Sequence, residues 1–264
     1  FFEKKVCFTF DDSLKCQLDI ALPVMKDFNI KAFFFVYTNI YESNPCLLEA
    51  YRYFRMNYYS DVNKFYKDFY THVQNNLPKK DLIKYLKVNQ KNILKEKKKY
   101  KVHTFEDIEF RYIRTFFLNE KSYKKIMIEM FNKNNFNYKK EIKKLFFSKQ
   151  DLFKLHKNSH FIGLHSHSHP TKIENLSHNK QTEEYKSNKK ALSKIIGSNN
   201  ISSMSHPHGS YNPKILKELK NLNIEIGFDN GMKNKYENCK VNNSKLEISR
   251  EDHSMIMRRI KNKH

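Results

Sequence analysis

The chain of 264 residues has no tryptophan, five glycines, six prolines and four cysteines. No apolar run is long enough to cross a bilayer, and residues 33–36 have only the length of a strand. The cysteines show no CxxC spacing, which favours reduced structural thiols over a zinc site or a disulfide framework. They are Cys7, Cys16, Cys46 and Cys239.

No secretory signal is visible at the start of the chain. We therefore expect a cytoplasmic protein, and the alternative is a cytoplasmic protein attached to the surface of a membrane. Residue 1 is Phe rather than Met, so we also expect that native residues precede it.

Negative charge is scarce: 28 acidic residues face 50 basic ones, for a formal net charge of +22. Residues 79–101 hold ten lysines against Asp81 and Glu96. This segment is either a surface for phosphate groups or a solvated, lysine-rich helix face in a chain that is rich in Lys and Asn throughout. A nucleic acid partner is not expected, because the segment contains no motif that reads bases.

The first 42 residues predict a β-α-β unit, and hence a parallel sheet or barrel. Residues 5–10 and 30–37 are apolar strands, and residues 14–28 have helical spacing between them. Pro23 interrupts this helical pattern and predicts a kink or a late helix start.

Residues 43–147 show no strand alternation and contain no glycine. Their helical periodicity predicts an all-helical insertion. The clearest helical segments are 47–58, 62–73, 82–94 and 123–131.

Alternation of helices and strands resumes at a helix start in residues 148–151. The predicted strands are 161–164, 201–205, 224–228 and 246–249. The predicted helices are 182–196, which ends near Gly197, and 213–222, which Asn212 caps.

Two loops that follow predicted strands carry residues typical of a metal centre. Asp11 and Asp12 follow the first strand, and His165 and His169 follow strand 161–164. Loops at the carboxyl ends of parallel strands converge. A carboxylate with two histidines leaves a position open on a divalent metal, as catalytic sites do. The second carboxylate could hold or deprotonate a water.

Each motif also has a simpler interpretation. Paired aspartates mark turns or helix caps, and Asp12 could cap the helix that follows it. Residues 156–178 hold six histidines, most of which would be ordinary polar residues. Adjacent carboxylates repel each other, however, and a cation between them removes that conflict. The two motifs together therefore favour the metal centre.

The segments at 9–12 (TFDD), 30–36 (IKAFFFV) and 162–170 (IGLHSHSHP) resemble the motifs of the polysaccharide deacetylases, the NodB-like carbohydrate esterases. The resemblance covers residues 1–42 and about 148–253. It implies an α/β fold, an incomplete or distorted (β/α)7-type barrel of the NodB homology type, with a large all-helical insertion after strand two. Residues 1–42 and 148–264 would form the discontinuous catalytic barrel, and residues 43–147 the insertion.

The resemblance also implies roles for the site residues. Asp12, His165 and His169 would hold one divalent metal ion, zinc first, with cobalt or nickel as alternatives. Asp11 would be the general base that activates water.

Residues 205–212 lie where the family has its R-x-P-[YF]-G motif, and Pro207 and Gly209 match it. The backbone N–H of His208 would be the oxyanion donor, and Tyr211 would line the substrate site. Ser205 replaces the family's arginine. The side chains of His206 and His208 would contact the substrate directly, or else line the pocket or face solvent.

The late L-x-H motif of the family, which supplies its catalytic acid, is not recognisable. Arg250 could stand in for the missing arginine at the base. His253, oriented by Asp252, could protonate the leaving amine. The alternative is a charged C-terminal turn with Arg250 in a surface salt bridge.

These features predict a metal-dependent hydrolase that removes an N-acetyl group from a sugar, with O-acetyl as the second choice, in surface-glycan biosynthesis. The insertion would cover the cleft or bind the distant part of an acetylated glycan that is phosphate-linked. The alternatives are a hydrolase of another C–N bond on this fold and a non-catalytic glycan- or phosphate-binding relative. The oligomeric state is not predicted.

Overall fold

The computed structural model describes residues 6–42, 45–99, 103–229 and 244–261. Cys239 and the predicted ends at Lys5 and Lys101 lie outside these residues. The chain forms two compact units: Phe1–Cys46 with Lys144–His264, and Leu47–Lys143. Each unit is described by itself below.

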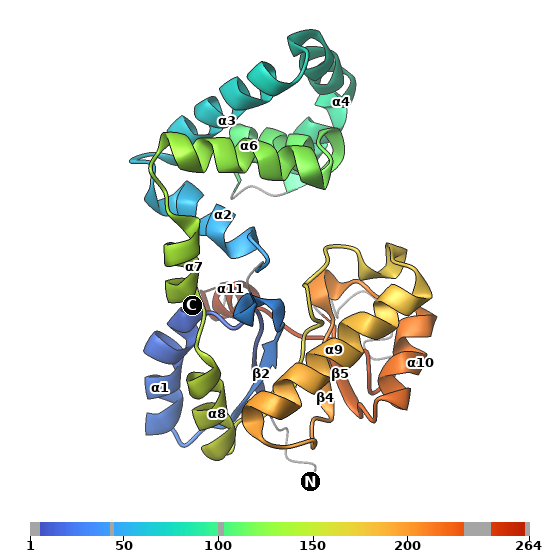
Figure 1. Cartoon of the computed structure of the whole chain (residues 1–264). Helices are drawn as coiled ribbons and strands as arrows, with labels where there is room; N and C mark the ends of the chain where they lie inside the picture. Colours follow the sequence, from blue (N-terminus) through green and yellow to red (C-terminus); the bar gives the residue numbers. More distant parts are fainter. Residues whose placement is uncertain (1–5, 43–44, 100–102, 230–243, 262–264) are drawn as a thin grey trace. The chain divides into compact units, whose positions relative to one another are not determined.

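The first unit is built on five parallel strands that pair in the order in which they follow along the chain (Figure 1). They are β1 (Phe8–Phe10), β2 (Ala32–Val36), β3 (Phe161–Leu164), β4 (Ser203–Ser205) and β5 (Ile226–Phe228). The sheet is curled into a half-barrel. The prediction of an incomplete (β/α) barrel is therefore confirmed.

Helices connect these strands, as the parallel order requires. They are η1 (Gln17–Ala21), α1 (Leu22–Asp27), η2 (Asn39–Tyr41), α8 (Lys149–Lys157), η4 (Ile173–Asn175), α9 (His178–Ile196), η5 (Pro207–Gly209) and α10 (Pro213–Asn221). One more helix, α11 (His253–Lys261), follows the last strand. Helix α11 was not predicted from the sequence.

Local sequence signals explain several of the helix ends. Pro23 lies in the first turn of α1, where its missing N–H costs no hydrogen bond, so the pattern at 14–28 divides into η1 and α1. Ser148 and Asp151 form a capping box that begins α8. Gly197 ends α9 in the left-handed conformation, with φ of 68°.

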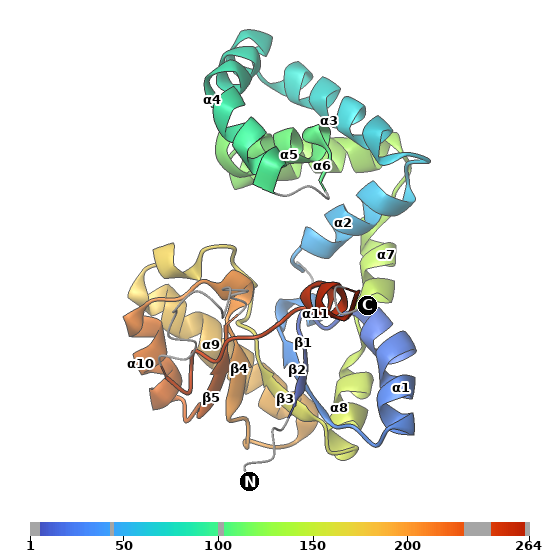
Figure 2. The ribbon, with the colours of Figure 1, turned by 180° about the vertical axis from the view of Figure 1, so that it is seen from behind.

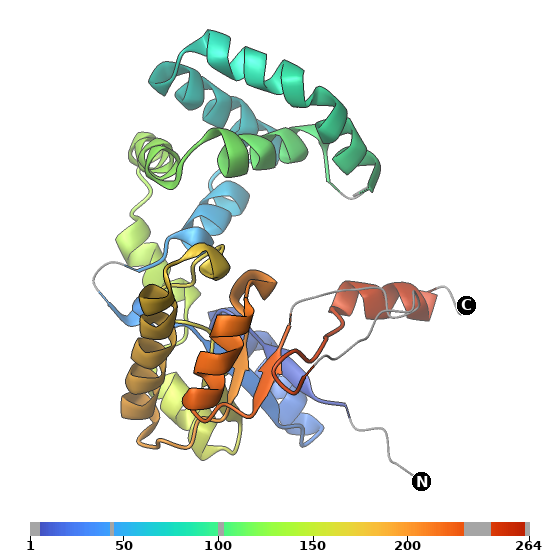
Figure 3. The same cartoon turned by 90° about the vertical axis from the view of Figure 1, so that its right-hand side faces the viewer.

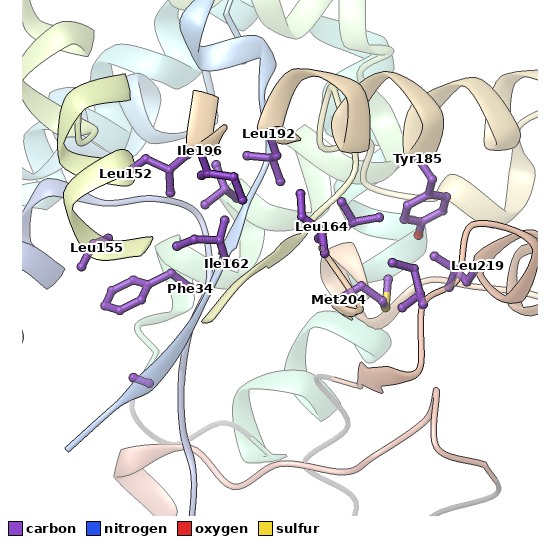
Figure 4. Packing of buried hydrophobic residues seen from close by; sticks show 14 of the residues in the cluster. Phe34, Leu152, Leu155, Ile162, Leu164, Tyr185, Leu192, Ile196, Met204 and Leu219 are labelled. Carbon is purple, nitrogen blue, oxygen red and sulfur yellow. The ribbon is translucent and has the colours of Figure 1, made fainter. Parts of the chain in front are cut away.

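The two faces of the sheet carry different apolar clusters. On one face, Phe34, Leu164 and Met204 pack against residues of α8, α9 and α10 (Figure 4). On the other face, aromatic rings fill the curl of the sheet, and Phe33 stacks on Phe161 with ring centroids 4.7 Å apart. Gly163 is required there, because a Cβ atom would lie 2.5 Å from the ring of Phe35.

The prediction of a strand at 246–249 is wrong. Ile248 forms a single parallel bridge with Phe228, and no strand develops. The carbonyl of Leu246 accepts a hydrogen bond from His206 Nε2 at 2.8 Å and so is not used for pairing with β5. The backbone of Leu246 also lies so close that a Cβ at Gly227 would be 2.6 Å from its oxygen.

The second unit is entirely helical where it is described, as predicted (Figures 2 and 3). Its elements are α2 (Leu48–Asn57), α3 (Val62–Asn76), α4 (Lys79–Lys99), α5 (Phe105–Tyr112), η3 (Ile113–Phe117) and α6 (Glu120–Lys133), with α7 (Tyr138–Leu145) at the boundary. Buried aromatic rings such as Phe54, Phe69 and Phe131 form its core. Among the described residues, no helix of either unit has the length and apolar character needed to span a membrane.

Candidate active site

Asp12, His165 and His169 converge at the carboxyl ends of β1 and β3. Asp12 Oδ1 lies 3.3 Å from His165 Nε2 and 3.1 Å from His169 Nε2. The two Nε2 atoms are 3.2 Å apart. Both imidazoles are buried, whereas Asp12 is partly exposed. Three potential ligands thus face one point.

The chemistry of these three donors fits a cation. His165 Nδ1 lies 2.8 Å from the carbonyl oxygen of Ser205, which can only accept, so Nδ1 carries the hydrogen and Nε2 presents a lone pair. Asp12 Oδ1 is buried and accepts no well-formed hydrogen bond from any described residue. A divalent metal ion would satisfy all three atoms.

The electrostatics of the site also favour positive charge. Burial acts to raise the pKa of Asp12, but the close imidazoles of His165 and His169 hold it far below its usual range. Burial acts to lower the pKa of His165, but Asp11 and Asp12 raise it overall. The two carboxylates therefore attract a cation, whether a proton or a metal ion.

The loops that carry these three residues contain positions in the left-handed backbone region, which is unfavourable for residues other than glycine. They include Asp12, Ser166 and His169, with φ of 70°, 61° and 58°. Ser166 Oγ accepts a hydrogen bond from the backbone N–H of His169 at 3.1 Å. Contacts of this kind hold the loop in a conformation that the chain alone would disfavour.

Two polar residues of α9 support the histidine loop. The carboxylate of Glu184 accepts hydrogen bonds from the backbone N–H groups of His167 and Ser168, at 2.9 and 2.7 Å. Ser168 Oγ donates a third, at 2.5 Å. Glu184 therefore holds the segment between His165 and His169.

Asn188 lies one turn further along α9 and is fully buried. It accepts a hydrogen bond from the backbone N–H of His165 at 3.0 Å and donates one to the carbonyl of Val36 at 2.9 Å. The sequence analysis missed both Glu184 and Asn188. A buried stripe of α9 that includes Gln181, Tyr185 and Asn188 was the available signal, since polar residues in such a stripe need partners.

Asp11 and Arg250 form a bidentate pair beside the metal ligands. Arg250 Nη1 and Nη2 donate to the two carboxylate oxygens of Asp11, at 2.9 and 2.7 Å. Arg250 Nη2 also donates to Ser205 Oγ at 3.0 Å. Ser205 stands where the resemblance places the family's arginine, and Arg250 reaches Asp11 from a different segment.

The remaining donors of Arg250 are also used, by Thr9 Oγ1 and by the carbonyl of Asp229. Burial acts to raise the pKa of Asp11, but the charge of His165 and the contacts with Arg250 lower it below its ordinary value. Asp11 is therefore held as an oriented, ionised carboxylate.

The segment from Ser205 to Tyr211 divides its residues between the site and the core. His206 is fully buried, stacks on Tyr211 with centroids 4.2 Å apart, and has a pKa lowered by burial to about 4. It is a neutral core residue. The Tyr211 hydroxyl donates to Glu247 at 3.1 Å, and the structure shows no contact of Tyr211 with the three metal ligands in the described part of the chain.

His208 is exposed, and its ring centroid lies 4.6 Å from that of His169. Pro207 is buried, and His208 and Gly209 both have left-handed backbones, with φ of 54° and 67°. This tight turn places the His208 ring beside the ring of His169, one of the three candidate ligands.

His253 is exposed at the first residue of α11. Within the described residues it makes no hydrogen bond or ion pair with Asp11 or the metal ligands. Asp252, which was expected to orient it, accepts a hydrogen bond from the hydroxyl of Ser254 at 2.6 Å. The structure thus brings Asp11, Arg250 and the three candidate ligands together, and it shows no contact of His253 with them among the described residues.

Several solved structures resemble this chain at low sequence identity. A deacetylase of Streptococcus pyogenes, PplD in complex with acetate, is 17% identical, with a TM-score of 0.49, and the match covers 94% of this chain and 64% of that one. A de-N-acetylase from Aggregatibacter actinomycetemcomitans is 12% identical, with a TM-score of 0.48 and coverage of 97% and 75%. A CE4 family pseudoenzyme from Bacillus anthracis is 10% identical, with a TM-score of 0.40 and coverage of 84% and 42%. This chain thus spans less than two thirds of the length of PplD.

No sequence among the curated proteins matches this chain. The family model described as polysaccharide deacetylase matches residues 2–106 and 95–227. The matched residues include both loops that carry the aspartates and histidines of the site. The chain belongs to the polysaccharide deacetylase family.

Proposed function

We propose that this protein is a metal-dependent hydrolase that removes an N-acetyl group from a sugar. Membership of the family supports carbohydrate deacetylation in general. The observation that carries the finer proposal is the convergence of Asp12, His165 and His169 beside the Asp11–Arg250 pair. A ligand set next to an oriented carboxylate is what hydrolysis of an amide requires.

Asp12, His165 and His169 would hold one divalent ion, zinc first, with cobalt or nickel as alternatives. Such an ion supplies Lewis acidity, which lowers the pKa of water and polarises the acetyl carbonyl. The hydrogen bond from His165 Nδ1 to Ser205 keeps Nε2 free for the ion, and the Glu184 contacts keep the loop in place.

Asp11 would take the proton from the attacking water at its carboxylate. The two hydrogen bonds from Arg250 orient that carboxylate and keep it ionised until the proton arrives. The backbone N–H of His208 would stabilise the oxyanion, and Pro207 and Gly209 would shape the turn that presents it. His253 would give a proton to the leaving amine, which is the one role that requires a group outside the observed cluster.

The preferred substrate is an acetylated sugar in surface-glycan biosynthesis. The excess of basic residues suits a glycan that carries phosphate. Removal of the acetyl from nitrogen rather than oxygen is proposed because an amide needs the stronger activation that a metal and a base together provide.

The experiment is to measure metal content and acetate release together. Wild-type protein and the His165→Ala/His169→Ala variant are dialysed, analysed for metals, and assayed on oligomers of N-acetylglucosamine. About one equivalent of metal in the wild type, lost in the variant together with acetate release, is the expected result.

The same assay separates the alternatives. Acetate release from O-acetylated sugars alone would replace the N-acetyl assignment. Hydrolysis of small amides or imides but not of sugars would indicate another C–N hydrolase on this fold. Bound metal and bound glycan without any hydrolysis would indicate a non-catalytic relative and contradict the proposal.

A further inference from the structure

Arginine is rare in this chain: seven of its 50 basic residues are arginines, and the others are lysines. Four of the seven lie in the helical unit, on α2, α5 and η3. We call them the arginine cluster: Arg52, Arg55, Arg111 and Arg114. Because lysine supplies charge almost everywhere else, arginine at these positions indicates a need for its planar, forked donors.

Phe110 underlies part of the cluster. The guanidinium carbons of Arg55 and Arg114 lie 5.5 and 5.8 Å from the centroid of its ring, which is itself buried. Contact with an aromatic ring orients a guanidinium without neutralising its charge. The two groups are thus held in place while their positive charge remains.

Two carboxylates balance part of this charge. Asp107 is buried and accepts from Arg111 Nε at 2.7 Å, and it lies 3.4 Å from Arg55 Nη1. Arg52 pairs with Glu49. A purely structural role therefore accounts for three of the four arginines, but two carboxylates leave a surplus of positive charge.

Arg114 is the residue without an acidic partner. It is partly buried, and within the described residues it forms no ion pair; its hydrogen bond to Thr115 Oγ1 is long, at 3.4 Å. Burial lowers the pKa of Arg114, and the charges of Arg111, Arg55 and Arg52 lower it further. A guanidinium that is both desolvated and surrounded by like charge is costly unless an anion binds there.

A fifth group beside the cluster can donate a hydrogen bond. Burial raises the pKa of Tyr123 to about 12, and the nearby charges of Arg114, Arg55 and Arg52 oppose that rise. The phenol therefore keeps its proton at neutral pH. The side chains of Arg52 and Arg111 are 50% and 41% exposed, so a ligand can reach the cluster from solvent.

We propose that the arginine cluster of the helical unit is a binding site for a phosphate group. Its surplus of two positive charges matches a dianion, and arginine forks match the oxygens of a phosphate bidentately. Arg114 would make the central contact, beside Arg55 at the same Phe110 ring. The site is distinct from the lysine-rich surface of α4, and it does not depend on the proposed hydrolase activity.

The test is calorimetric titration of the full chain with inorganic phosphate and with N-acetylglucosamine 1-phosphate, at fixed salt. We expect saturable binding that Arg114→Gln weakens about tenfold or more. Arg114→Lys should weaken it as well, because it keeps the charge but loses the fork. The matched control is Lys84→Gln, which removes one exposed charge from α4 of the same unit and should leave binding unchanged.

The outcomes are separable. Equal weakening by Lys84→Gln and Arg114→Gln would show a diffuse charge effect and overturn the proposal. So would a wild-type protein that binds neither of the soluble probes nor phosphatidic acid vesicles. Thermal melts of the Arg114 variants guard against loss of fold, and Arg114→Lys serves if Arg114→Gln unfolds. Binding of phosphatidic acid vesicles but of neither soluble probe would assign the phosphate to a lipid headgroup. Phosphate binding by the His165→Ala/His169→Ala variant would separate this site from the hydrolytic centre.

Discussion

Arg250 and Arg114 show two uses of the same side chain in the two units of this molecule. All the N–H groups of Arg250 donate hydrogen bonds inside the protein, and two of these bonds go to the Asp11 carboxylate, at 2.9 and 2.7 Å. Arg114 has no carboxylate partner among the described residues. An arginine that is paired internally orients a reacting group, whereas one that is left with surplus charge can recognise a ligand. The comparison predicts that the two residues respond differently to the same substitution.

The largest effect on turnover is expected at the carboxylate that Arg250 orients. Asp11→Asn should lower the rate of acetate release about 10²–10⁴-fold, because the proton acceptor is lost. Metal content should stay near that of the wild type, whereas Asp12→Asn should lose both metal and activity. Full activity in Asp11→Asn would contradict the assignment of the base.

Removal of the proposed acid should have the next largest effect. His253→Ala should slow hydrolysis of an N-acetyl sugar about 10²-fold, because the leaving amine needs a proton. An aryl acetate, whose leaving group needs none, should be hydrolysed at nearly the wild-type rate and serves as the control. Unchanged rates on both substrates would show that His253 takes no part in the mechanism and is an ordinary exposed residue.

The direct test of the comparison is the same change at both arginines. Arg250→Lys should lower kcat on the order of 10-fold to 10²-fold, because it keeps the charge but loses the bidentate alignment of Asp11. Arg114→Lys should leave kcat on a phosphate-free sugar unchanged. Arg259→Lys, at an ion pair with Glu251, is the matched control for Arg250. Equal losses at positions 250 and 114 would break the distinction between the two uses.

Glu184 tests whether the ligand loop must be held from α9. Glu184→Gln replaces a charged acceptor of three hydrogen bonds and should weaken metal affinity about 10-fold to 10²-fold. The neighbouring Glu183→Gln, at an exposed position on the same helix, should have no effect. The measurement is metal competition with a chelator, and equal affinity in both variants would show that the loop holds its own shape.

The last effect is on stability rather than on turnover or metal affinity, and it is set by pH. His206 has a folded-state pKa of about 4 against an ordinary value of 6.5. The free energy of unfolding should fall by up to about 3 kcal/mol as the pH is lowered from above 6.5 towards 4. The reason is that the unfolded chain takes up a proton on this histidine at a higher pH than the folded chain does. Urea unfolding at neutral and acidic pH measures this, and His206→Gln should flatten the pH dependence. An identical slope in the variant would show that other groups cause it.

Much of the fold was predictable because its signals are local. The apolar run at 30–37, the capping residues Ser148 and Asn212, and Gly197 depend on a few neighbouring residues each, and the helices and strands follow them closely. The segment at 246–249 failed as a strand for a non-local reason. Its backbone is drawn to Gly227 and to a buried histidine elsewhere in the chain.

By itself, the sequence determined the order of elements and the two motifs, since spacing along the chain suffices to place Asp12 and both histidines after strands. Only the tertiary structure decided which distant side chains meet. Arg250 reaches Asp11 across 239 residues, and Asn188 reaches Val36 across 152. The four arginines of the helical unit likewise gather from two separate segments. Such contacts depend on packing of the whole unit, because closing so long a loop costs entropy that only the completed core repays.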